Sequence, residues 1–358
     1  DRLYIKNLIK YITSSYQERF YINSFTEKNI FLKYLNEETD KIDILLISYM
    51  NYSDDIYSEK INTMIVLTEG NINKDFNGVK AINKYQRVSS LVSEILNIFS
   101  ESTQEEVYLP VGEKKTKIIG VYSISGGAGK TSVSAAASII SARNNKEIFY
   151  LNLESINSSL RFFESNSNHS ISKLFYYIKE RDKNLQLKIE AIKSVDTNYN
   201  VHYFQPQDSA LELDDLKPDE LTLLVDKFRL MGQYEFVFID MNNAYDNKNI
   251  ELIKACDKVI VLLDYNPISD YKVNIFEREI DILSNRLGIN IFDKLMPVIN
   301  KFNPNMYSNY QERAILQKDI NVKIPFDIEV YSQGFLSTIN NNESLFTRGI
   351  HDLLNKLL

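Results

Sequence analysis

Hydrophobic positions divide the first hundred residues into amphipathic stretches and continuous apolar runs that alternate along the chain. Apolar side chains recur at helical spacing in residues 1–14, 26–36 and 89–99, which predicts three helices. Thr26 is the predicted N-cap of the second. The β-prone runs are 19–22, 42–48, 61–68 and 79–83. Continuous apolar runs are typical of strands covered on both faces, so this region is predicted to be an α/β domain with a parallel sheet.

A second α/β pattern begins at Lys117 and continues to Leu358. Its predicted strands are residues 117–123, 147–153, 201–204, 236–240, 258–263 and 294–299, with helical segments between them. The pattern predicts a doubly wound, mostly parallel sheet. The polar segment 101–116 is predicted to be a linker, which gives domains 1–100 and 117–358. The apolar stripe in residues 342–358 predicts a last helix that packs onto the sheet.

Composition narrows the function classes. The chain has 41 Lys and Arg against 48 Asp and Glu, a net charge of −7, and no strong basic run, so DNA binding is not expected. A single cysteine, Cys256, excludes an intrachain disulfide and suits a cytoplasmic protein. With three histidines and no Cys/His cluster, a structural zinc site is not expected. No apolar run approaches the ~18–20 residues that span a bilayer.

The turn after strand 117–123 is rich in glycine and reads Ser125-Gly126-Gly127-Ala128-Gly129-Lys130-Thr131-Ser132. Closely spaced glycines let backbone amides converge on a phosphate chain at the start of a helix. Lys130 is placed to reach the β- and γ-phosphates, Thr131 to ligate Mg²⁺ and Ser132 to donate to the α-phosphate. The alternative is a Gly-rich turn with a surface lysine. Ile124 stands where the full P-loop pattern has glycine, so the turn is a variant.

Three polar residues lie at the ends of predicted strands, and each has two interpretations. Asp240 can orient Mg²⁺ and its waters, or it can cap a loop. Glu154 can orient an attacking water, or it can be an ordinary solvated acid. The amide of Asn300 suits an adenine edge, or it can form a turn.

Together these motifs resemble the ParA/MinD superfamily of deviant Walker A ATPases, in the same order over residues 117–358. The matching segments are the Gly-rich turn, YEFVFIDMNNA with Asp240, PVINKF with Asn300, and Ile324-Pro325-Phe326-Asp327. The resemblance implies ATP and Mg²⁺ as cofactors. It assigns Gly126 to Ser132, including Ala128 and Gly129, to phosphate and Mg²⁺, Asp240 to the metal, Asn300 to adenine, and Pro325 and Asp327 to the base or ribose.

The α/β domain before the ATPase resembles the atypical receiver domain of TadZ/CpaE pilus-assembly proteins within that superfamily. The resemblance implies a degenerate, flavodoxin-like receiver whose first strand is absent or truncated before Asp1. Ser48 then stands in place of the phospho-acceptor aspartate, so no phosphorelay is expected there. Thr68 and Lys84 stand at the receiver's switch positions.

Two departures from the superfamily affect the expected activity. Ser125 replaces the lysine that reaches the partner's nucleotide, and Asn152 and Glu154 replace an aspartate pair. With Lys130 and Glu154 as the catalytic residues, we expect tight MgATP binding and slow or absent hydrolysis. The implied protein is a cytoplasmic, homodimeric ATP switch that joins pilus or secretion machinery at the cell pole or the inner face of the membrane. The alternatives are a ParA-like DNA-segregation ATPase, disfavoured by the acidic balance, and a metabolic P-loop enzyme.

Overall fold

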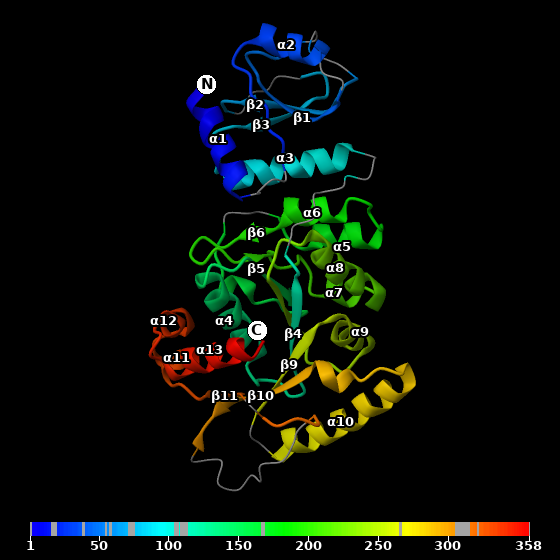
Figure 1. Cartoon of the computed structure of the whole chain (residues 1–358), viewed down its shortest axis with the longest axis vertical. Coiled ribbons are helices and arrows are strands. Elements are labelled where there is room, and N and C mark those ends of the chain that lie inside the picture. The colour runs from blue at the N-terminus through cyan, green and yellow to red at the C-terminus, as the bar shows by residue number, and fades with distance from the viewer. Residues whose placement is uncertain are drawn as a thin grey trace. The chain divides into compact units, whose positions relative to one another are not determined.

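The computed structural model describes residues 2–15, 20–37, 40–53, 56, 59–70, 76–103, 107, 114–165, 169–264, 267–304, 316–320 and 322–357. The chain divides into two units (Figure 1), Asp1–Pro110 with Arg181–Lys193, and Val111–Glu180 with Ser194–Leu358. The first division falls within segment 101–116, of which residues 104–106 and 108–113 lie outside the described residues. The first unit therefore includes a short segment that the chain contributes from within the second.

A small parallel sheet forms the centre of the first unit, as the alternating pattern predicts. Its strands lie in chain order, β1 (Ile42–Ser48), β2 (Ile61–Thr68) and β3 (Lys80–Asn83). Apolar residues of α1 (Arg2–Ser15), α3 (Val88–Ser102) and α6 (Leu185–Ile192) form one core with the sheet, and those of α2 (Lys28–Glu37) form another. Both faces are covered, which is why the strands read as continuous apolar runs.

Two local expectations for this unit are wrong. Residues 20–22, the described part of the predicted strand at 19–22, have no regular structure. The aromatic side chains that follow are used in packing instead, since the ring of Phe25 lies 5.5 Å from that of Phe31. Thr26 is not the N-cap, because α2 begins later and the Glu27 carbonyl accepts from the Phe31 amide at 3.2 Å.

The second unit is built on an eight-stranded sheet in the order β11-β10-β9-β4-β8-β5-β7-β6. The pairs are parallel except β6–β7. The strands are β4 (Lys117–Ser123), β5 (Ile148–Leu153), β6 (Ser194–Val195), β7 (His202–Tyr203), β8 (Phe236–Met241), β9 (Lys258–Leu263), β10 (Leu295–Phe302) and β11 (Val322–Pro325). The doubly wound, mostly parallel sheet is confirmed.

Helices cover both faces of this sheet (Figure 1). On one side lie α4 (Lys130–Arg143), α11 (Glu329–Ser332), α12 (Phe335–Asn340) and α13 (Leu345–Leu357). On the other lie α5 (Ser172–Lys179), α7 (Leu211–Asp214), α8 (Pro218–Met231), α9 (Asn247–Ala255) and α10 (Pro267–Leu287); η2 (Ser159–Arg161) and η3 (Ile291–Lys294) are single 3₁₀ turns. The predicted packing of the last helix is confirmed, since Ile350 and Leu353 are fully buried in the sheet's core.

The carboxyl ends of the central strands place the site. β4, β5, β8, β9 and β10 are parallel, so the residues that follow them meet at one edge of the sheet. α4 starts at this edge and lies close to the sheet, because its inner face carries small buried residues such as Ser134 and Ala135. The Gly-rich turn, Glu154 and Asp240 are therefore brought together although they are far apart in sequence.

Candidate nucleotide site

The loop between β4 and α4 has a backbone that depends on glycine. Gly127 and Gly129 adopt φ values of 78° and 93°, which side chains with a Cβ rarely adopt. Gly129 is the N-cap of α4 and has no side chain with which to cap the helix. The first amides of α4 therefore stay available to an anionic ligand, and the helix dipole favours negative charge there.

Two side chains at the end of β10 hydrogen-bond to this loop. The buried side chain of Asn300 donates to the Ala128 carbonyl at 2.8 Å, and the Lys301 ammonium donates to the Gly127 carbonyl at 2.8 Å. A Cβ on Gly129 would lie 2.4 Å from Asn300 Nδ2. β10 runs on to Phe302, so Asn300 lies inside the strand and does not form a turn.

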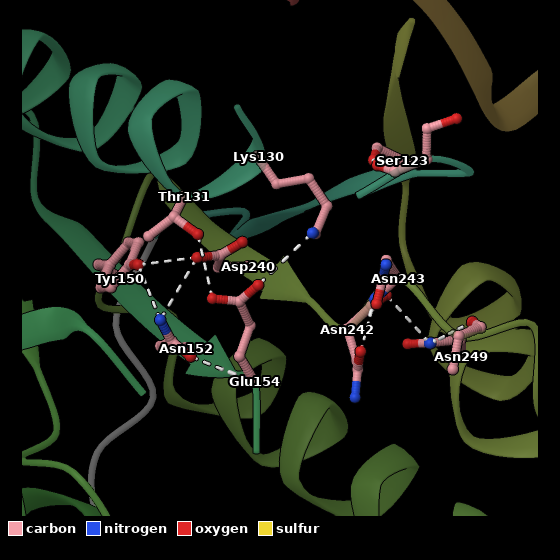
Figure 2. A network of polar contacts seen from close by, with 12 residues as sticks. Ser123, Lys130, Thr131, Tyr150, Asn152, Glu154, Asp240, Asn242, Asn243 and Asn249 are labelled. Atoms are coloured by element: carbon pink, nitrogen blue, oxygen red, sulfur yellow. Dashed lines mark hydrogen bonds and ion pairs between the residues drawn. The ribbon is translucent and has the colours of Figure 1, made fainter. Parts of the chain in front are cut away.

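Glu154 bridges two functional side chains of the loop. Its Oε1 lies 3.4 Å from Lys130 Nζ, and its Oε2 accepts from the Thr131 hydroxyl at 3.0 Å (Figure 2). Its own amide donates to Asn152 Oδ1 at 2.8 Å. The Glu154 side chain is 22% exposed and the Lys130 side chain 9%, so the interpretation as an ordinary solvated acid is wrong.

Asp240 is a buried carboxylate, and only one of its two oxygens accepts hydrogen bonds. Its Oδ2 accepts from the Tyr150 hydroxyl at 3.0 Å and from Asn152 Nδ2 at 3.3 Å, both on the neighbouring strand β5. Its Oδ1 is buried and has no hydrogen-bond partner among the described residues. Burial, and next the negative charge of Glu154, raise the pKa of Asp240 to about 7.

These oxygens fit a magnesium ion. Thr131 on α4 and Asp240 on β8 lie close together, with the Glu154 carboxylate beside them (Figure 2). Oxygen ligands are those that Mg²⁺ prefers, and a cation would satisfy the partnerless oxygen of Asp240. Within the described residues, no group of three or more His, Cys, Asp or Glu could hold a metal by itself. Such a cation would therefore need water and phosphate oxygens as further ligands, as Mg²⁺ commonly does.

Ser125, which stands at the position of the superfamily's extra lysine, contacts α10. Its hydroxyl lies 2.8 Å from that of Ser269, a buried residue in the first turn of α10. Ser269 in turn donates to the carboxylate of Asp264 after β9. The loop is thus attached to α10 by neutral hydroxyls.

Asp327 and Pro325 have structural contacts. Both carboxylate oxygens of Asp327 accept backbone amides, from Glu329 at 2.9 Å and from Phe346 at 3.1 Å. Asp327 therefore caps the starts of α11 and α13. Pro325 lies against α13, since a Cβ on Gly349 would approach its Cδ to 2.9 Å.

Sequence reasoning missed several residues of the site. Tyr150 lies two positions before Asn152 on β5, and the period of two in a strand could have placed both side chains on one face with Asp240. Asn243 was also missed, and a Cβ on Gly126 would lie 3.7 Å from its Nδ2. The Asn249 side-chain amide donates to the Asn242 carbonyl at 3.1 Å and to the Ala244 carbonyl at 2.6 Å. These hydrogen bonds fix the loop that follows β8 (Figure 2).

Solved structures of two kinds of ATPase resemble this chain. A ParA family ATPase from Chlorobium tepidum matches with a TM-score of 0.52 and 12% identity, over 66% of this chain and 96% of that one. MinD from Pyrococcus horikoshii, solved with Mg-ADP, matches with a TM-score of 0.51 and 16% identity over 68% and 96%. MinD from Aquifex aeolicus gives 0.51 and 14% over 67% and 96%. The second unit has the ParA/MinD fold.

No family model matches the sequence, and neither does any curated protein. Among the described helices, none combines the length and apolar character that a membrane crossing requires.

Proposed function

We propose that the second unit binds ATP with Mg²⁺ and works as a nucleotide switch with slow or absent hydrolysis. One observation carries the proposal: Lys130, Thr131 and the partnerless Oδ1 of Asp240 meet where a glycine-dependent loop opens the N-terminus of α4. An ammonium, a hydroxyl and a carboxylate at a helix N-terminus are what a magnesium-bound triphosphate requires. The ParA/MinD fold supports this assignment.

In this proposal each residue has a defined task. The loop amides from Gly126 to Ser132 surround the phosphates, Lys130 pairs with the β- and γ-phosphates, and Thr131 and Asp240 hold the metal. Magnesium, when bound, neutralises charge on the phosphate oxygens. Asn300 keeps the loop in place and faces adenine, with Pro325 and Asp327 on the ribose side.

Slow turnover follows from two features of the site. Ser125 is neutral and hydrogen-bonded to Ser269, so it supplies no charge to a transferring phosphate. Glu154 is the candidate for orienting water, but its carboxylate contacts Lys130 and Thr131. Once a bound nucleotide displaces it from these contacts, Glu154 is still one methylene longer than the aspartate expected there, which makes it a less well-placed base for an attacking water.

We further propose that ATP favours a homodimer and that the switch serves Tad-type pilus assembly in the cytoplasm. Three large apolar residues on segments near Glu154 are exposed to solvent. Their exposed fractions are 84% for Ile156, 57% for Leu160 and 68% for Leu211, and a second copy of the chain would cover them. The parallel α/β unit that precedes the ATPase unit supports the pilus role, through its resemblance to TadZ/CpaE. The net charge of −7 disfavours the DNA-segregation alternative.

Calorimetry on the full chain tests the nucleotide proposal. MgATP is titrated into the wild-type protein, Lys130→Ala, and Lys254→Ala as a matched control whose lysine pairs with Glu251 on α9. We expect heat of binding for wild type and control and its loss in Lys130→Ala. Equal binding by all three, or by none, contradicts the assignment.

Light scattering and a DNA mobility shift separate the roles of the switch. A mass that doubles with MgATP but not with MgADP supports the dimeric switch. Salt-sensitive DNA binding would instead favour segregation. A turnover well above about 1 s⁻¹, in the ordinary enzyme range, would contradict slow hydrolysis.

A further inference from the structure

We propose that Glu154 is an internal competitor of the nucleotide, so that MgATP binds only when Glu154 releases Lys130 and Thr131. The inference rests on the proposed function and concerns the regulation of the same site. One carboxylate engages both side chains, at 3.4 Å from Lys130 Nζ and 3.0 Å from Thr131 Oγ1. These are the ammonium that would pair with phosphate and the hydroxyl that would ligate the metal.

A carboxylate and a phosphate compete for such groups because they make the same interactions. Both are anions with acceptor oxygens in a fixed arrangement, and each satisfies a largely buried ammonium. The Lys130 side chain is only 9% exposed, so it needs an anionic partner at all times. A triphosphate and the Glu154 carboxylate cannot both stay there, because like charges at contact distance repel strongly in a partly buried site.

Only the side chain of Glu154 is free to make this exchange. Its backbone is held on both sides, by the Asn152 carboxamide at its amide and by Gln207 Nε2, which donates to its carbonyl at 3.1 Å. Gln207 also donates to the Ser155 carbonyl at 2.8 Å. Rotation about the side-chain torsions therefore releases the carboxylate, and its 22% exposure gives it a path to water.

The length of the glutamate side chain makes the double contact possible. Aspartate at this position is one methylene shorter, and with the backbone held by Asn152 and Gln207 it would not reach both Lys130 and Thr131. Glu154→Asp therefore keeps the charge but loses the bridge. Glu154→Gln keeps the length but loses the charge that binds the ammonium.

The experiment measures MgATP affinity of the full chain by calorimetry for wild type, Glu154→Gln, Glu154→Asp and Asp214→Asn. Asp214 is the matched control. Its exposed carboxylate accepts a hydrogen bond from the Ser155 hydroxyl at 3.3 Å, so its substitution removes one negative charge beside the residue that follows Glu154. We expect Glu154→Gln to bind MgATP about ten-fold more tightly, the effect of removing one charge-assisted contact. The MgATP affinity of Glu154→Asp should lie between those of wild type and Glu154→Gln. The affinity of Asp214→Asn should stay within about two-fold of wild type.

A second readout needs no nucleotide. The rate at which an amine-reactive ester modifies Lys130 is followed by mass spectrometry in protein without added nucleotide. Removal of the Glu154 contact should make Lys130 react faster in Glu154→Gln than in wild type, with no change in Asp214→Asn.

Three outcomes have distinct meanings. If wild type binds MgATP and Glu154→Gln binds it no more tightly, the proposal that Glu154 competes with the nucleotide is refuted. An equal gain in Asp214→Asn would attribute the effect to general electrostatics and would also refute it. If no variant binds MgATP, the proposed function itself fails, and this inference fails with it.

Discussion

Gly129→Ala is the substitution that the geometry of the loop makes most informative. Its added methyl would meet two obstacles, the φ of 93° and Asn300 Nδ2 at 2.4 Å. The Asn300 amide is the end of a side chain and could rotate away, but it is buried and donates to the Ala128 carbonyl at 2.8 Å. Rotation therefore breaks that hydrogen bond inside the protein.

The two effects have separate magnitudes. A non-glycine residue held in left-handed backbone costs roughly 1–2 kcal/mol. Leaving the buried carbonyl of Ala128 without its donor costs about 1–3 kcal/mol. We therefore expect Gly129→Ala to lower the free energy of unfolding by about 2–5 kcal/mol.

A double-mutant cycle with Asn300→Ala separates these contributions. In the Asn300→Ala background the methyl has room, so Gly129→Ala should cost only the backbone part, about 1–2 kcal/mol. Urea unfolding can be followed by tyrosine fluorescence, because the chain has 23 Tyr and no Trp, with circular dichroism as the second probe. Equal costs in both backgrounds, or a cost below about 0.5 kcal/mol in wild type, would refute the packing argument.

Three further substitutions test other parts of the second unit. Asp240→Asn should stabilise the protein more at pH 8 than at pH 5: the folded pKa is about 7 against about 4 unfolded, so wild-type stability falls as pH rises between them. Urea unfolding at both pH values checks this, and a pH-independent difference contradicts it. Asp327→Ala should lower stability by about 1–3 kcal/mol in thermal unfolding, since two helix starts lose their acceptor; unchanged stability with lost MgATP binding would favour the ribose role instead. Gly349→Ala should cost about 1–3 kcal/mol, because its Cβ would lie 2.9 Å from the backbone of Ile324, and an unchanged melting temperature would show that α13 can shift freely.

Local chemistry was sufficient to predict the elements that are both long and regularly patterned. The strands Ile42–Ser48, Ile61–Thr68, Lys117–Ser123 and Lys258–Leu263 end at the predicted residues, because each is a mainly apolar run. The glycine loop was recognisable because its conformational demand is local. The short run 19–22 and the N-cap of α2 were predicted wrongly, because weak local preferences were outweighed by aromatic packing around Phe25.

By itself, the sequence determined that a glycine loop, a lysine and a threonine stand between a strand and a helix, and that acids lie at the ends of two other strands. Those are properties of consecutive residues, and backbone preference and spacing are enough to express them. Only the tertiary structure decided what Glu154, Asp240 and Asn300 contact, because their partners lie on other elements. Side-chain contacts between distant segments depend on strand order and on the depth of burial, and no local pattern records either.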